Sequence, residues 1–194
     1  ASDPARPEET EMKLLIVAPA TIVSFVSFSS NALAQERVPY AGSTAAGFDI
    51  GAFIPRSDEL SSSALLNGTY EYYLTPRISV RAGVGWWNPG FAVGAVDSLM
   101  QVPLTFDANY NWERGKWHPF VGAGLGVHFL QFRSDLPSTD NTETKLGFNT
   151  GGGIEYFLNR MLALKGEGRY HAIEDARGEQ TSGTAITVGL KTYF

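Results

Sequence analysis

The stretch AITVGLKTYF, residues 185–194, decides between the folds open to this chain. In an extended strand, successive side chains point to opposite faces. One face of this strand is apolar, with Ile186, Val188, Leu190 and Thr192, and the other is mixed or polar, with Ala185, Thr187, Lys191 and Tyr193. The apolar face belongs either on the core of a water-soluble protein or against lipid, with the polar face inside a barrel.

Seven earlier segments alternate in the same way, so the sequence predicts eight strands. They cover residues 45–54, 66–74, 78–87, 101–112, 117–130, 146–158 and 161–172. Charged residues occupy only the polar face of each segment: Asp49, Glu71, Arg81, Asp107, Glu155, Lys165, Glu167, Arg169 and Lys191. Alternation alone does not exclude a soluble sandwich or lipocalin, in which the charged face would be outside.

The segment ends favour a membrane protein. Aromatic residues on the apolar faces gather there, as in a girdle at a membrane interface: Tyr72, Trp112, Trp117, Tyr156 and Phe194. Connections after the second, fourth and sixth segments are short (TPR, ERGK and NR), whereas the other four are long and mostly polar. Short turns on one side and long loops on the other are typical of outer-membrane barrels. We therefore predict an all-β fold, an eight-stranded antiparallel up-and-down transmembrane β-barrel with periplasmic N- and C-termini, closed by the last strand against the first.

The start of the sequence predicts export. Residues 12–34 combine an early lysine, an apolar run and the small-residue sequence Ala32-Leu33-Ala34, which together indicate a signal peptide cleaved after about Ala34. Residues 1–11 are interpreted as an upstream extension, 35–44 as a short lead, and 45–194 as the barrel domain.

Composition excludes several function classes. Residues 35–194 carry 13 Lys and Arg against 16 Asp and Glu, so nucleic acid is not an expected partner. The chain has no cysteine, which excludes disulfides and thiolate chemistry. After the predicted signal peptide, the sequence contains no run of about 18 consecutive apolar residues, the length that a membrane helix requires. A barrel is then the only way for the exported part to cross a bilayer.

These features resemble one known family. The eight alternating segments, the motifs HPFVGAGLGVHF (residues 118–129) and GGGIEYFLN (151–159), and the terminal Phe194 are similar to the small eight-stranded outer-membrane β-barrels of the OmpA and OmpX type. The resemblance implies location in the Gram-negative cell outer membrane and contact with its lipid and lipopolysaccharide. It also implies that the barrel-insertion machinery reads the C-terminal strand. Implied roles range over envelope integrity, surface interactions through four extracellular loops, and small-solute passage.

The barrel interior is the candidate site. Because eight strands leave an interior only wide enough for side chains, we expect these charged residues to pair there: Glu71, Arg81, Asp107, Glu155, Lys165, Glu167 and Arg169. Two hypotheses are a structural plug and a gated or narrow ion path. Inward glycines either admit long side chains from other strands or leave a cavity. Gly122→Ser, which faces inside, is expected to be tolerated better than an arginine on the outward face at Val121 or Leu164.

Two other functions stay open. A narrow channel for small or hydrophobic solutes could open through the wall at Pro103, which lacks a backbone donor; a bulge there is the alternative. A lipid-modifying enzyme would need His128 or His171 with an acid such as Glu174 and a loop serine. The third histidine, His118, lies near a turn. The histidines and acidic residues do not follow the spacing of a known catalytic, metal-binding or cofactor-binding motif, so we predict no catalytic residues, metal site or cofactor.

Overall fold

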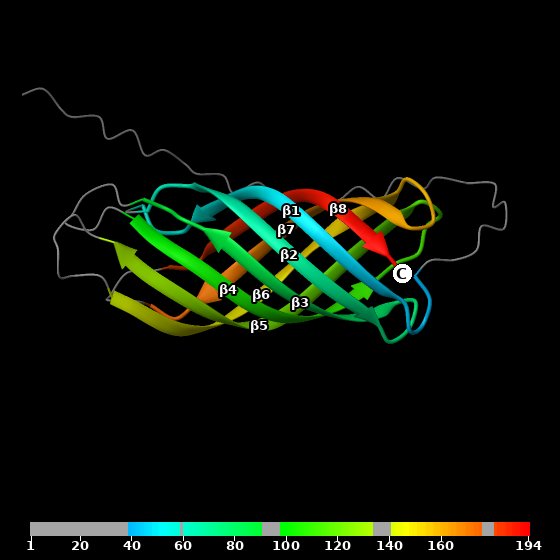
Figure 1. Cartoon of the computed structure of the whole chain (residues 1–194), viewed down its shortest axis with the longest axis horizontal. Coiled ribbons are helices and arrows are strands. Elements are labelled where there is room, and N and C mark those ends of the chain that lie inside the picture. Colours follow the sequence, from blue (N-terminus) through cyan, green and yellow to red (C-terminus); the bar gives the residue numbers. More distant parts are fainter. Residues whose placement is uncertain (1–38, 59, 91–97, 134–140, 176–180) are drawn as a thin grey trace, which may run out of the picture. The chain divides into compact units, whose positions relative to one another are not determined.

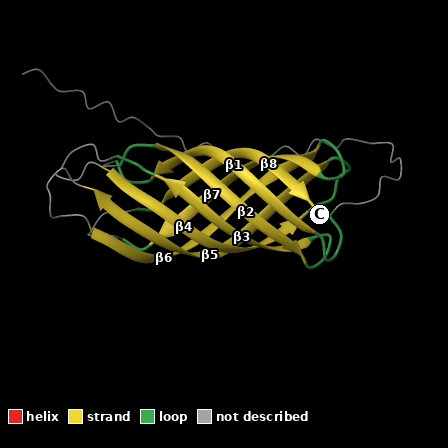
Figure 2. Cartoon of the chain, in the orientation of Figure 1, coloured by secondary structure: helices red, strands yellow, loops and turns green. Residues whose placement is uncertain are grey.

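The structure is a computed structural model that describes residues 39–58, 60–90, 98–133, 141–175 and 181–194. The expected signal peptide, residues 12–34, lies outside the described residues. Eight strands follow one another along the chain (Figures 1 and 2): β1 (Thr44–Pro55), β2 (Ser63–Tyr73), β3 (Ile78–Trp87), β4 (Ser98–Asn111), β5 (Trp117–Arg133), β6 (Asn141–Phe157), β7 (Leu162–Ile173) and β8 (Gly183–Tyr193). Within the described residues, no helix is long and apolar enough to span a membrane.

The strands form a closed antiparallel barrel, which confirms the predicted fold. Each strand pairs with its neighbour in sequence, and β8 pairs with β1 from Ala45↔Tyr193 to Pro55↔Gly183. Closure leaves no sheet edge along this seam, so backbone donors and acceptors are satisfied inside the protein. The strands contain 10 to 17 residues, enough to cross a hydrocarbon core when tilted.

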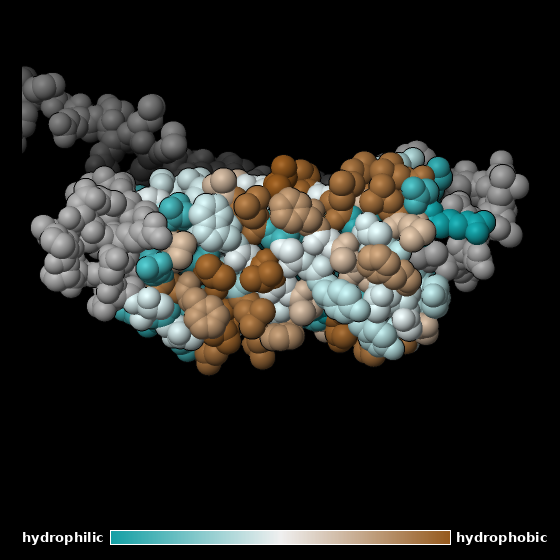
Figure 3. Space-filling model, viewed as in Figure 1, coloured by the Kyte–Doolittle hydropathy of each residue, from teal (hydrophilic) through white to brown (hydrophobic). Residues whose placement is uncertain are grey.

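Side chains divide between the two faces as the alternation predicts. The apolar face points outward: Leu125 is 68% exposed and Val188 61% exposed, and apolar residues cover much of the outer surface (Figure 3). All nine charged residues on the polar face are buried. A soluble sandwich would have the opposite arrangement. The charged face is therefore the interior and the apolar face is the one that suits lipid.

The three short turns are fixed by local hydrogen bonds. Thr75 Oγ1 accepts from the backbone N–H groups of Arg77 and Ile78 in the β2–β3 turn. Asn159 Oδ1 does the same for Met161 and Leu162 in the β6–β7 turn. In the β4–β5 turn, Gly115 adopts a φ of 64°, a left-handed conformation that favours glycine.

The largest difference from the predicted strands is at one hairpin, while β2 and β4 each begin three residues earlier than predicted. We expected a loop over residues 133–144, but β5 continues to Arg133 and β6 begins at Asn141, so the two strands extend further. In this extension, exposed Thr142 and Thr144 replace the apolar outward residues, and Glu143 pairs with Lys145 at 3.3 Å. Alternation of apolar and polar residues identifies a strand only where one face contacts lipid. In this extension neither face is apolar, so the pattern is absent.

Pro103 interrupts one ladder without shifting its register. The β3–β4 pairs Val84↔Leu104 and Trp87↔Gln101 share one register, but the two intervening pairs are absent. On its other side, Pro103 pairs with His128 in an unbroken β4–β5 ladder. Pro103 is buried, and its ring occupies the space over Gly85, where an added Cβ would lie 2.9 Å from the proline Cγ. The interruption is therefore local, and the bulge considered as an alternative is absent from these described strands.

Outward residues near mid-barrel should not accept a charge. We expect Leu125→Arg and Val188→Arg to destabilise the barrel in lipid by about 2–4 kcal/mol, because the guanidinium would enter the hydrocarbon. The measurements are the yield of heat-modifiable protein on gels and equilibrium unfolding in lipid vesicles. Leu125→Met and Val188→Ile are the matched controls. Equal yields from the arginine variants and their controls would contradict the lipid-facing assignment.

Candidate functional site: the filled barrel interior

Apolar and aromatic side chains form one buried cluster near each end of the interior. At the end that carries the three short turns, Ala45, Tyr73, Phe157, Ala163 and Tyr193 form one buried cluster, which we call the turn-side cap. At the other end, Phe53, Leu65, Trp87 and Ala185 form a second, the loop-side cap. The Phe53 and Trp87 rings stack with centroids 4.7 Å apart. Charged residues fill the space between the two caps.

Six residues make the central cluster, in which three cations meet three carboxylates. Arg81 donates two hydrogen bonds of 2.9 Å to the Glu167 carboxylate and one of 3.2 Å to Asp107. Arg169 Nε donates to Glu167 at 2.7 Å. Lys165 Nζ lies 2.8 Å from Asp49 and 3.1 Å from Glu167. The cluster is neutral and its Arg–Glu contact is bidentate, a geometry that offsets much of the cost of burying charge.

Three residues make the turn-side cluster, in which one lysine holds two carboxylates. Lys191 Nζ lies 2.5 Å from Glu71 and 2.7 Å from Glu155, and donates a third hydrogen bond of 3.0 Å to Tyr73. Ser79 donates a hydrogen bond to Glu71, and Tyr193 donates one to Glu155. All three lysine protons are therefore used. The formal charge of −1 is spread over carboxylate oxygens that also accept from hydroxyl groups.

Inward glycines let side chains reach across a strand. Gly189 of β8 pairs in register with Lys165 of β7 on one side and with Asp49 of β1 on the other. Because Gly189 has no side chain, Lys165 reaches Asp49 over it. A Cβ at Gly189 would lie 2.2 Å from Asp49 Oδ1. Such a glycine, paired between two long polar side chains, is called a window glycine below.

The same packing bears on Gly122. A Cβ there would lie 2.0 Å from Asn109 Oδ1 and 2.8 Å from the Ala108 backbone oxygen. Gly122→Ser would therefore disturb the polar packing, and its better tolerance relative to an outward arginine stays a prediction. Of the two uses that the sequence left open for inward glycines, admission of neighbouring side chains is the one seen at Gly122 and Gly189.

A small cavity lies in the interior. It has a volume of about 40 Å³ and is lined by His171 and by residues of the central cluster and the loop-side cap, among them Arg81, Asp107, Arg169 and Trp87. This volume has room for about three water molecules. Water there would suit the buried Arg169 Nη2 and His171 Nδ1, which have no protein partner among the described residues.

Two of the three histidines lie together beside Trp87, and the third lies near the other end. His128 and His171 lie side by side, with ring centroids 5.9 Å apart, and both rings contact Trp87. Glu174 is exposed and accepts a hydrogen bond from the Leu146 backbone. His118, near the other end, contacts Phe157 and the Gly115 carbonyl. In the described part of the chain, no group of three His, Asp or Glu side chains could hold a metal ion.

The structure brings together all seven charged residues expected in the interior: Glu71, Arg81, Asp107, Glu155, Lys165, Glu167 and Arg169. Asp49 and Lys191 also lie in the interior, although the expected set omitted both. Their position on the polar face of their segments could have predicted this. The sequence could not predict the partners, because Glu71 bonds Lys191, 120 residues away, while its register partner Arg81 bonds Glu167.

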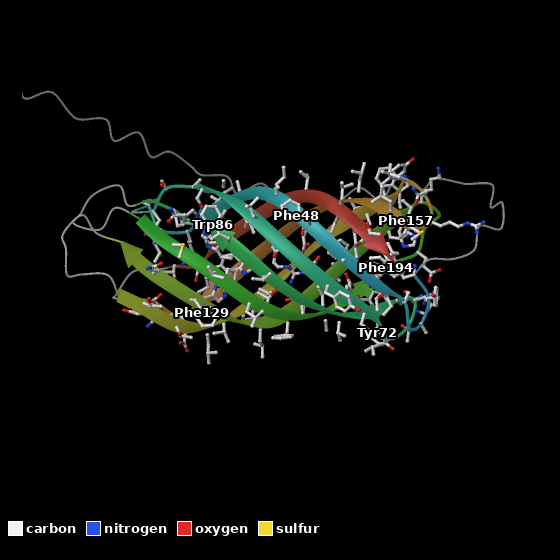
Figure 4. The ribbon with its side chains drawn as sticks, in the orientation of Figure 1. Phe48, Tyr72, Trp86, Phe129, Phe157 and Phe194 are labelled. Carbon is white, nitrogen blue, oxygen red and sulfur yellow. The ribbon has the colours of Figure 1, made fainter. Side chains whose placement is uncertain are left out.

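The expected aromatic girdle lies on the outer surface at the turn-side end. Tyr72, Trp112, Trp117 and Phe194 are exposed there, and Tyr156 packs against Trp117 with ring centroids 4.6 Å apart. Figure 4 labels Tyr72 and Phe194 near this end, and Trp86 and Phe129 near the other. The last two are also exposed and outward, so aromatic residues flank the apolar surface at both ends.

A comparison with protein families gives one match over most of the chain. The family described as "Outer membrane protein beta-barrel domain" matches residues 20–194. No curated protein matches the chain in sequence.

Solved structures with the same fold include three bacterial surface proteins. Neisserial surface protein A (NspA) is 15% identical with a TM-score of 0.67, covering 79% of this chain and 98% of its own. OprG of Pseudomonas aeruginosa is 16% identical with a TM-score of 0.66, covering 80% and 97%. Ail of Yersinia pestis, solved with the heparin analogue sucrose octasulfate, is 12% identical with a TM-score of 0.58, covering 79% and 99%. At these identities the likeness concerns the fold alone.

The buried ion pairs should be strongly coupled. We expect Lys165→Met alone to destabilise the barrel by about 3–5 kcal/mol, because it strands Asp49. The double variant Asp49→Asn/Lys165→Met should lose at least 1 kcal/mol less than the sum of the two single variants, as an order of magnitude. Equilibrium unfolding of the four proteins in detergent measures this coupling. The control cycle is Glu143/Lys145, a partly exposed pair whose coupling should be about 0.5 kcal/mol. Additive effects at Asp49 and Lys165 would rule out direct pairing.

Window glycines should reject even a methyl group. Gly189→Ala should lower the free energy of unfolding by about 1–3 kcal/mol, because its Cβ would collide with Asp49 Oδ1 and the Phe48 carbonyl. Gly168→Ala is the matched control, since no atom lies within 4 Å of its Cβ position on the outer surface. Chemical unfolding midpoints give the comparison. A loss at Gly168 as large as that at Gly189 would show that interior packing is not the cause.

Proposed function

The chain belongs to the outer membrane protein beta-barrel family, and from this premise we propose that it is a non-conducting barrel with an envelope-integrity or surface-interaction role. The observation that carries the proposal is the filled interior. Two buried charge clusters lie between two apolar caps, and the cavity among them holds about 40 Å³. Such a barrel acts through its outer wall and its loops.

The filled interior supports a plug more than an ion path. An ion in transit would have to separate Arg81 from Glu167, a buried bidentate pair, and then pass the stacked Phe53 and Trp87 rings. Breaking one buried pair costs about 3–5 kcal/mol. Because each cation of the central cluster contacts at least one carboxylate, separating one contact disturbs its neighbours.

The proposal assigns an orientation and partners. The short turns and the end of β8 face the periplasm, and the four long connections face outward as sites for surface ligands. Lipid and lipopolysaccharide surround the apolar wall. A signal peptide over residues 12–34 directs export, and the barrel-insertion machinery reads the C-terminal strand that ends in Phe194. Ail, with the same fold, was solved in complex with a heparin analogue, which supports a surface-interaction role for a barrel of this fold.

A narrow channel is the second candidate, favoured by the interrupted ladder at Pro103. Two rungs are missing between β3 and β4 there, and Pro103 also lines the cavity. A path from the cavity through the wall would require the proline ring to leave its place over Gly85. The enzyme hypothesis has less support, because Glu174 is exposed whereas His128 and His171 are buried beside Trp87.

Conductance distinguishes the plug from the channel. Purified protein in planar lipid bilayers should give no stable current steps. Arg81→Ser/Glu167→Ser should give brief openings, because it removes the bidentate pair while keeping the interior charge unchanged. Leu125→Met, on the outer wall, is the control and should be silent. Stable steps from the unmodified protein would overturn the plug and favour the channel.

A further inference from the structure

The three short turns form a basic rim at one end of the barrel. The turns, residues 74–77, 112–116 and 158–161, contain four basic residues and one acidic residue. The basic residues are Arg77, Arg114, Lys116 and Arg160, and all four are exposed. The described residues of the long connections at the other end, 56–58, 60–62, 88–90, 174–175 and 181–182, contain one basic and three acidic residues. The formal charge of the described residues is therefore +3 in the short turns and −2 in the long connections.

Backbone hydrogen bonds set the basic turns side by side. The Arg77 carbonyl accepts from the N–H of Asn111, which joins the β2–β3 turn to the start of the β4–β5 turn at 2.7 Å. The Lys116 carbonyl accepts from Phe157 N–H at 2.9 Å and joins that turn to the β6–β7 turn. The turns thus follow one another around the rim in the order β2–β3, β4–β5 and β6–β7, at the end that carries the label C in Figure 1.

The rim lies directly beyond the aromatic girdle. Trp112 precedes Arg114 by two residues, and Lys116 is followed at once by Trp117. Both tryptophans are exposed on the outer wall, at 40% and 45%. Because such rings occupy the level of lipid headgroups, cations one or two residues further along lie within side-chain reach of the phosphates. Long basic side chains of this kind extend their charge to the interface.

We propose that this rim, comprising Arg77, Arg114, Lys116 and Arg160, binds the phosphate groups of anionic phospholipids in the leaflet that the short turns face. Arginine suits the task because its planar guanidinium can donate two hydrogen bonds to one phosphate. The tight turns contribute by fixing the backbone from which the side chains project, so little loop entropy is lost on binding.

Tryptophan quenching tests the proposal at the rim itself. The chain has four tryptophans, of which Trp87 is buried and Trp86 lies near the other end. In a Trp86→Phe background, quenching by lipids therefore reports on Trp112 and Trp117. The protein is reconstituted in phosphatidylcholine vesicles containing phosphatidylglycerol, with bromine on the acyl chains of either lipid. We expect phosphatidylglycerol to be preferred about fivefold at low salt, since one basic residue near a membrane surface contributes about that factor. The preference should fall in about 1 M salt.

A matched pair of double variants locates the effect. Arg77→Gln/Lys116→Gln should reduce the preference at least to half, whereas Arg56→Gln/Lys145→Gln, which removes the same charge at the other end, should keep it. Heat-modifiability on gels checks that each variant is folded. No preference in the unmodified protein, or an equal loss in both variants, would overturn the proposal. A conducting barrel would leave the lipid preference unchanged, so failure of the plug and failure of the rim are distinguishable.

Discussion

Closure of the sheet is the constraint on which every other feature depends. A strand in hydrocarbon has no water to satisfy its backbone, and an open edge would leave a row of donors and acceptors unpaired. The ladder between β1 and β8 removes that edge. Once the ring of eight strands is closed, the pleat sends alternate side chains into a space that no solvent can fill freely. The charges placed there must find partners among themselves.

The sequence predicted the fold because lipid imposes one rule on every strand. Each outward residue must be apolar, so the alternation of strand β8 recurs in seven other segments and excludes charge from one face. The rule ends where the lipid ends. The extension of β5 and β6 carries Thr142 and Thr144 outward in place of apolar residues, and the alternation consequently gave no sign that these strands continue to Arg133 and from Asn141.

The interior was predicted as a set but not as pairs. The alternation of faces along each strand places Asp49 and Lys165 inside, yet the two residues are 116 positions apart and lie on strands that are not neighbours. Their contact depends on the register of both strands with β8 and on the glycine between them. Register in turn depends on all eight strands closing together, which no local pattern records. The crowding at Gly122 has the same origin, because the Asn109 side chain that fills its space comes from the neighbouring strand.

The window glycine Gly189 also has a mechanical meaning. In a simple barrel, lateral tension in the membrane is carried from strand to strand by the hydrogen-bond ladder alone, and a single seam is the weakest point. Here Lys165 of β7 forms an ion pair with Asp49 of β1 across the inner face of β8. The ion pair therefore links the two strands that flank β8, in addition to the two hydrogen-bond ladders of β8. Separating β8 from either neighbour must then also stretch this ion pair, which joins the two strands on either side of β8.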